Sequence, residues 1–141
     1  MNMQYAEIDE LLTKSMARYG TAQVIDYLRK IDDHIDCRNS DSYKKIFEIV
    51  LNHFDVSERD LKRPRITESV NARRVLCYML NTYTKFDYKI ICRVVGISEL
   101  NFYRYVKYIS DVMKDYHINK DLNESVKNIE LKYHSDGNER N

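Results

Sequence analysis

The chain has 141 residues, enough for one domain with a hydrophobic core. Only three Gly and one Pro leave few tight turns, which favours helices over many short strands, and the net charge is +1. No apolar run approaches the roughly 18 residues of a membrane span, and the N-terminus lacks the apolar segment of a signal peptide. The three cysteines have no paired spacing, so we expect a reduced, cytoplasmic setting.

In chain order, the hydrophobic spacing predicts seven helices joined by short turns. Their expected ranges are 4–19, 22–35, 42–53, 67–83, 86–95, 99–114 and 120–132. Gly20 is expected to end the first helix and Thr21 to cap the second, residues 37–41 to form a polar loop, and Ser57 to open a short capped turn. The predicted fold class is therefore all-α, a multi-helix bundle.

The ends of the chain differ from its centre. Residues 1–41 indicate an acidic helical pair in which each helix carries an apolar stripe, and residues 133–141 a polar, disordered tail. The main body spans 42–132. We expect the N-terminal pair either to pack on this body or to form an interface, with a second copy in a homodimer or with another protein partner.

The charge is unevenly distributed along the chain. Residues 1–60 carry 8 Lys or Arg and 12 Asp or Glu, a net of −4, whereas residues 61–120 carry 12 and 5, a net of +7. Residues 121–141 carry 3 and 5, a net of −2. A basic central block is typical of a phosphate-binding surface, although solvated helix faces can also cluster by chance.

Residues 91–107, I-C-R-V-V-G-I-S-E-L-N-F-Y-R-Y-V-K, have the pattern of a helix-turn-helix. An apolar helix ends at Val95, Gly96 can take the positive φ of a tight turn, and Ser98 is a good N-cap for the next helix. The second helix of this motif usually enters the DNA major groove. The 3–4 spacing of Phe102, Val106 and Ile109 predicts that they face inward. A plain helical hairpin without a ligand is the alternative.

Residues 42–132 resemble the C-terminal DNA-binding domain of the bacterial replication initiator DnaA, of the Trp-repressor-like helical class. The resemblance rests on V-L-N-H-F-D-V-S-E-R-D-L, a basic K-R-P-R loop, a long helix S-V-N-A-R-R-V-L-C-Y-M-L, the helix-turn-helix and H-I-N-K-D-L before a last helix. These features cover about two thirds of the chain in the family's order. The resemblance implies double-stranded DNA as the partner, in replication or transcription control.

The chain departs from that family at its reading residues. The family's Asp-His-Thr signature falls on Glu99-Leu100-Asn101, or on Ser98-Glu99-Leu100 in the other register, so its His and Thr are absent. The position of the family's minor-groove arginine is near Asn71, with Arg73 and Arg74 just beyond. No G-x-x-x-x-G-K-[ST] phosphate loop exists, so the family's nucleotide-hydrolysing module is missing. Because the family's His and Thr are absent, the resemblance implies DNA binding without implying recognition of the same DNA box.

Catalytic and metal chemistry find little support. The four histidines are scattered, and the cluster of Asp33, His34 and Cys37 is better explained as a solvated acidic face than as a metal site. Tyr103, Tyr105 and Tyr108 could stack on bases or contact phosphates, but packing as amphipathic aromatics explains them equally well. We expect a protein that is not an enzyme and needs no cofactor or metal.

The sequence thus predicts a free-standing DNA-reading head. The expected phosphate contacts are Lys62, Arg63, Arg65, Arg73, Arg74 and Lys107. The expected base-edge contacts are Leu100, Asn101, Tyr103 and Arg104, because Asn and Arg can bind adenine and guanine with paired hydrogen bonds. The alternative is a protein-interaction module that keeps this fold without recognising a DNA box.

Overall fold

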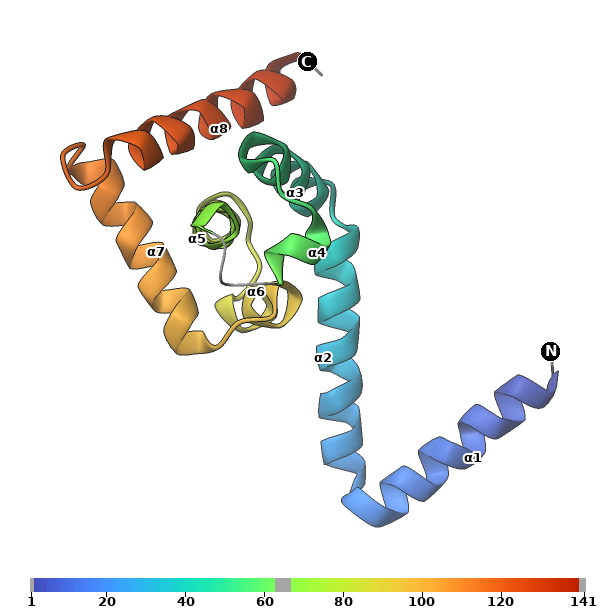
Figure 1. Ribbon diagram of the computed structural model, residues 1–141. Coiled ribbons are helices and arrows are strands. Elements are labelled where there is room, and N and C mark those ends of the chain that lie inside the picture. The colour runs from blue at the N-terminus through green and yellow to red at the C-terminus, as the bar shows by residue number, and fades with distance from the viewer. Residues whose placement is uncertain (1, 63–66, 140–141) are drawn as a thin grey trace. The chain divides into compact units, whose positions relative to one another are not determined.

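The structure is a computed structural model that describes residues 2–62 and 67–139. Side chains are described for residues 7–62 and 67–135. Within these ranges the chain forms α-helices and no strand, which confirms the predicted all-α class (Figure 1). The helices are α1 (Asn2–Tyr19), α2 (Thr21–Asn39), α3 (Asp41–Phe54), α4 (Glu58–Leu61), α5 (Thr67–Tyr83), α6 (Tyr88–Val95), α7 (Glu99–Lys114) and α8 (Lys120–Glu139).

The chain divides into two compact units between Asp36 and Cys37. We call residues up to Asp36 the N-terminal unit and residues from Cys37 onward the body. The division lies a few residues before the boundary expected at 41. The loop predicted for residues 37–41 is wrong, since residues 37–39 are helical. Helix α2 continues to Asn39 and buries Cys37 completely in the core of the body. Ser40 then caps α3, its Oγ accepting a hydrogen bond from the Tyr43 N–H at 3.1 Å.

The body is built around α5, whose bounds agree with the predicted helix. Figure 1 shows α5 nearly end-on, with α3, α6 and α7 around it, and α8 packs against α3 and α7. Helix α5 can occupy the centre because apolar or small side chains point from it in several directions. Its buried residues are Ser69, Ala72, Val75, Leu76, Cys77, Met79 and Leu80. Full burial of each larger aliphatic side chain contributes about 1.5–3 kcal/mol, so α5 holds the other helices together.

Specific side chains fix the helices that surround α5. Ser57 and Asp60 form a reciprocal capping box that starts α4, as the sequence predicted for a capped turn after Ser57. The buried Asn123 of α8 donates from Nδ2 to the Val112 carbonyl of α7 at 2.9 Å, which joins the two helices. The Tyr83 hydroxyl donates to the Glu130 carboxylate and so joins α5 to α8.

The expected disorder of residues 133–141 is not observed over 133–139, where α8 continues to Glu139 instead of ending at Lys132. The Tyr133 ring lies 5.2 Å from the Tyr83 ring, centroid to centroid, and the Lys45 ammonium lies 4.6 Å above the Tyr133 ring. These contacts to α5 and α3 add tertiary stabilisation to a segment whose polar sequence alone indicates fraying. Residues 140–141 lie outside the described chain.

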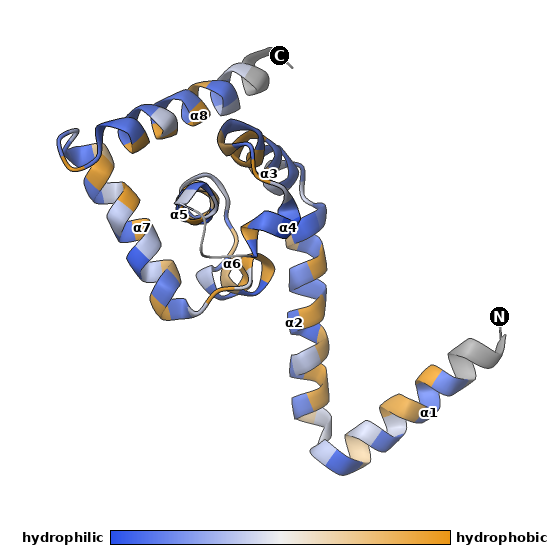
Figure 2. Ribbon diagram, viewed as in Figure 1, coloured by the Kyte–Doolittle hydropathy of each residue, from blue (hydrophilic) through white to orange (hydrophobic). Residues whose placement is uncertain are grey.

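The N-terminal unit has a different character. Gly20, with φ of 90°, separates α1 from α2 as predicted, and α2 begins at Thr21, one residue earlier than expected. From Glu7 to Asp36 no side chain is fully buried. Figure 2 shows hydrophobic residues recurring along both helices, although neither helix has a core of its own. In the described part of the chain, no helix is long and apolar enough to cross a membrane.

Candidate nucleic-acid interface

Helices α6 and α7 meet at a tight turn, and we call residues 88–114 the α6–α7 corner. Gly96 adopts φ of 81°, and its N–H donates to the Cys92 carbonyl at 2.8 Å, which ends α6. Ser98 has an extended backbone, and its Oγ accepts a hydrogen bond from the Asn101 N–H at 3.1 Å, which starts α7. The local roles predicted for Gly96 and Ser98 are therefore confirmed.

The two sides of α7 differ sharply in exposure. Phe102 is only 6 % exposed, stacks on Tyr88 with 6.3 Å between ring centroids, and shares the buried side with Ile109. Leu100 and Tyr103 are 58 % and 64 % exposed. Asn101, Arg104 and Lys107 are also exposed. The predicted phase of α7 is thus confirmed, and all the candidate base-edge residues reach solvent.

Arg73 and Arg74 lie against the corner. Arg73 is half-buried, and its Nη2 donates to the Gly96 carbonyl at 3.5 Å, a long hydrogen bond that ties α5 to the turn. The guanidinium of Arg74 lies 4.7 Å from the ring centroid of Tyr108 and 5.9 Å from that of Tyr105. Cation–π contacts of this kind contribute about 0.5–2 kcal/mol each. Arg74 therefore links α5 to α7 and Arg73 links α5 to the turn that precedes α7, contacts that the sequence did not reveal.

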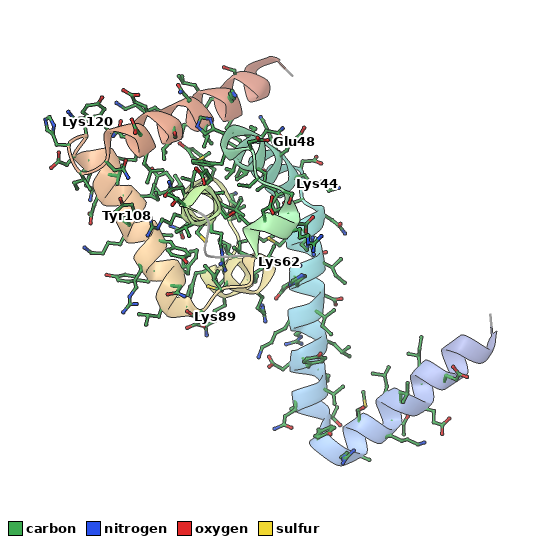
Figure 3. The ribbon with its side chains drawn as sticks, in the orientation of Figure 1. Lys44, Glu48, Lys62, Lys89, Tyr108 and Lys120 are labelled. Carbon is green, nitrogen blue, oxygen red and sulfur yellow. The ribbon has the colours of Figure 1, made fainter. Side chains whose placement is uncertain are left out.

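Two of the remaining predicted phosphate contacts, Lys62 and Lys107, have exposed side chains. Lys62 is exposed directly after α4, and Figure 3 labels it together with Lys89 of α6 and Tyr108 of α7. Lys107 forms an exposed ion pair with Asp111 one turn along α7, with 3.4 Å between Nζ and Oδ2. Such a pair is worth little in water and can open when a phosphate approaches. Arg63 and Arg65 lie outside the described residues.

Two exposed cations of α6 were missed by the sequence prediction. Lys89 and Arg93 are four residues apart and project away from Ile91 and Cys92, which are buried. Neither cation has a carboxylate within ion-pair distance in the described part of the chain. The apolar pairs at 90–91 and 94–95 indicate which side of α6 faces the core, so their spacing could have identified Lys89 and Arg93 as exposed.

The structure offers no alternative chemistry at the cysteines. Cys37, Cys77 and Cys92 are buried free thiols, and burial raises the pKa of Cys37 to about 11 and the pKa of Cys77 still further. A thiol with a raised pKa is a poor nucleophile, because the reactive thiolate is disfavoured. Within the described ranges, no three His, Cys, Asp or Glu side chains are grouped to hold a metal ion.

Comparisons of the chain with protein-family models, with curated proteins and with solved structures found no match.

Proposed function

We propose that the body binds double-stranded DNA, with α7 in the major groove. The observation that carries the proposal is the α6–α7 corner. The αL turn and the extended N-cap fix the start of α7, and one side of α7 is buried in the core, while Asn101 and Arg104 remain exposed near its N-terminal half. That half of a recognition helix meets base edges in helix-turn-helix proteins. Asn and Arg, three residues apart, share one side of the helix and suit adenine and guanine respectively.

The proposed phosphate contacts surround this helix. Lys62, Lys89, Arg93 and Lys107 are exposed on α4, α6 and α7 or directly beside them. In this motif the first helix crosses the DNA backbone, which suits the cations of α6. Arg63 and Arg65 are retained in the proposal from the sequence alone. Arg73 and Arg74 contribute chiefly by holding α7 in place.

The proposal rests partly on the resemblance to the DnaA DNA-binding domain, which gives a role in replication or transcription control. Leu100 stands at one of that family's polar reading positions and Tyr103 is exposed on the same helix, and we propose that they contact thymine methyl groups or stack against the DNA backbone. The second candidate function is binding of another protein, favoured by the large exposed surface of these two side chains.

Selection of bound sequences from random duplex DNA tests the proposal. We expect an enriched site, and we expect Asn101→Ala and Arg104→Ala each to weaken binding to it by about 1–3 kcal/mol while non-specific affinity is nearly unchanged. Lys127→Ala is the matched control, because Lys127 is exposed on α8, outside the proposed interface. Absence of any duplex binding at low ionic strength would support the protein-binding alternative.

The salt dependence of binding tests the phosphate contacts separately. The slope of log K against log salt concentration should be about −0.9 per phosphate neutralised. Replacing Lys89 and Arg93 together with Ala should flatten the slope by up to about two contacts without changing the preferred sequence. The same result is expected for Arg63→Ala with Arg65→Ala. An unchanged slope would remove the corresponding pair from the interface.

A further inference from the structure

The body contains a small pocket lined by side chains from α2, α3, α4, α5 and α6 and by Lys62. Its volume is about 60 Å³. A cavity needs about 10–15 Å³ to hold one water molecule, so this pocket has room for roughly four to six non-hydrogen atoms. Part of the lining is apolar, and part is polar. The apolar part consists of Phe47, Leu61, Leu76, Val94 and Val95.

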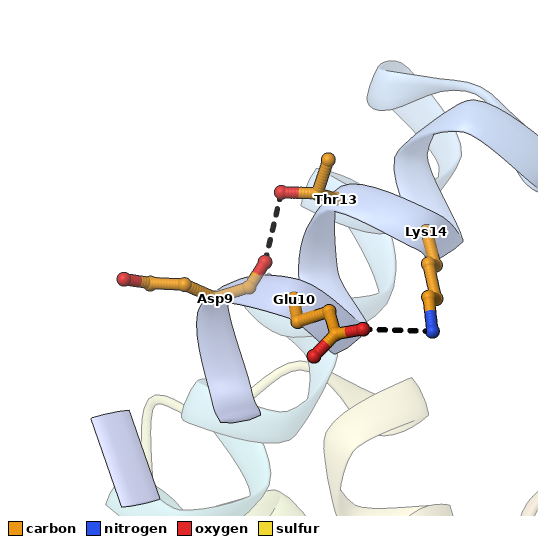
Figure 4. Close-up of polar contacts among 4 residues, drawn as sticks. All are labelled: Asp9, Glu10, Thr13 and Lys14. Carbon is orange, nitrogen blue, oxygen red and sulfur yellow. Dashed lines mark hydrogen bonds and ion pairs between the residues drawn. The ribbon is translucent and has the colours of Figure 1, made fainter. Parts of the chain in front are cut away.

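An ion pair between two helices forms one polar side of the pocket. Arg38, near the end of α2, pairs with Glu58 of α4, with 3.1 Å between Nη2 and Oε1. The ion pair of α1 instead lies within a single helix, where Lys14 Nζ is 2.9 Å from Glu10 Oε1 (Figure 4). The Arg38–Glu58 pair is exposed and adds little stability, but it offsets the negative charge of Glu58 at the pocket.

Tyr43 supplies a buried hydrogen-bond donor to the pocket. The residue is only 6 % exposed, and its ring stacks on that of Phe47 with 5.6 Å between centroids. Its hydroxyl forms no hydrogen bond with any residue in the described part of the chain. Burial raises the pKa of Tyr43 to about 12, and the charges of Arg38 and Glu58 also act on this pKa, in opposite directions, which places the hydroxyl near both. The hydroxyl therefore stays protonated at neutral pH and can donate to an acceptor in the pocket.

The charged groups of the lining favour an anion. Lys62 and Arg38 are positive and Glu58 is negative, so these residues carry a net charge of +1. Lys62 has no carboxylate within ion-pair distance among the described residues, and Arg38 has further N–H groups besides the one that faces Glu58. Ammonium, guanidinium and phenol donors suit the two oxygens of a carboxylate, whereas a cation would be repelled. The apolar walls suit a short hydrocarbon group.

We propose that this pocket binds a short aliphatic carboxylic acid in its anionic form, with roughly four to six non-hydrogen atoms, as in isobutyrate. The Tyr43 hydroxyl and the Lys62 ammonium bind the carboxylate, and the hydrocarbon group packs against Leu76, Val94 and Val95. Lys62 is also one of the proposed phosphate contacts, so the proposal is tested without DNA. Its outcome is then independent of the proposed DNA binding.

Titration of the full, nitrogen-15-labelled chain with isobutyrate at constant ionic strength is the first test, followed by NMR. We expect saturable shifts of the backbone amide signals of Tyr43, Leu61 and Val95, with a Kd on the order of 1 mM, because so small a ligand makes few contacts. Isobutyramide has nearly the same shape without the charge, and it should bind about tenfold more weakly. Equal affinities for the two compounds, or shifts that do not saturate, would overturn the proposal.

Two substitutions test the groups that bind the carboxylate. Tyr43→Phe removes a hydroxyl that bonds to no described residue, so thermal unfolding should be unchanged while isobutyrate binding weakens about three- to tenfold. Lys62→Gln should weaken binding by at least as much. Lys44→Gln is the matched control, because Lys44 is exposed on α3 beside Tyr43 in the sequence and does not line the pocket; Figure 3 labels both lysines. Unchanged binding by Tyr43→Phe, or equal weakening by Lys44→Gln and Lys62→Gln, would show that surface charge alone attracts the anion and would overturn the proposal.

Discussion

The two units of this chain are both helical, but their helices have different sources of stability. The body interlocks its helices through a common core in which Ile46, Leu76, Met79, Ile109 and Ile129 are fully buried. In the N-terminal unit the apolar side chains from Glu7 to Asp36 remain partly or largely exposed, and the polar contacts span single helical turns. Helical content therefore says little about stability: what matters is whether the apolar face of a helix is covered.

The largest expected difference between the units comes from one substitution made in each. Leu76→Ala removes a fully buried side chain and should destabilise the body by about 2–5 kcal/mol, through lost burial and a residual cavity. Leu28→Ala removes a side chain that is 39 % exposed, and under dilute, monomeric conditions it should cost less than about 1 kcal/mol. Urea unfolding measures both. Equal losses would show that Leu28 is covered within the monomer.

Phe102→Ala is the corresponding test at the α6–α7 corner. Loss of this buried ring should destabilise the body by about 3–5 kcal/mol. Tyr103→Ala, at the neighbouring exposed position, should change stability by no more than about 0.5 kcal/mol. Thermal unfolding of the two variants provides the comparison. If Tyr103→Ala unfolded the body and Phe102→Ala did not, the recognition residues would belong to the opposite side of α7.

A smaller effect is expected at the polar junction between α7 and α8. Asn123→Ala leaves the Val112 carbonyl without the amide that now donates to it at 2.9 Å, in a buried setting. We expect a loss of about 1–3 kcal/mol, because a buried acceptor without a partner keeps its desolvation cost. Ser125→Ala, half-buried on the same helix, is the control. A neutral Asn123→Ala would mean that the junction depends on apolar packing alone.

The next effect in size concerns the cap of α7. Ser98→Ala removes the hydroxyl that accepts from the Asn101 N–H, and we expect it to cost about 1 kcal/mol. Ser98→Asp should retain most of the stability, since a carboxylate can also accept this bond and suits the positive end of the helix dipole. Thermal unfolding would distinguish the two. Equal destabilisation by both variants would show that the hydroxyl does not act as a cap.

The smallest effect is expected in the N-terminal unit. Lys14→Ala breaks the exposed ion pair with Glu10, which should change stability by about 0.5 kcal/mol or less and should fade with added salt. Circular dichroism of the full chain against salt concentration would measure it. A large, salt-insensitive loss of helicity would mean that this pair is desolvated and that α1 depends on contacts beyond its own turns.

The sequence predicted those parts of the candidate site that depend on neighbouring residues. Gly96 and Ser98 end α6 and start α7 as expected, and the spacing of Phe102, Val106 and Ile109 gave the phase of α7. These features depend on φ preferences, on caps and on the 3.6-residue period, which act within a few residues. The base-edge candidates follow from that phase, although their role in DNA binding is still a prediction.

Tertiary structure alone decided the features that involve distant segments. Arg73 and Arg74 have the composition of phosphate contacts, but the chain places them beside Gly96 and Tyr108, more than twenty residues away. Helix α2 continues through Cys37 because the core of the body buries that thiol, and α8 continues past Lys132, where Tyr133 packs on Tyr83. Local propensity ends both helices early, whereas burial against a distant helix adds the free energy that extends them.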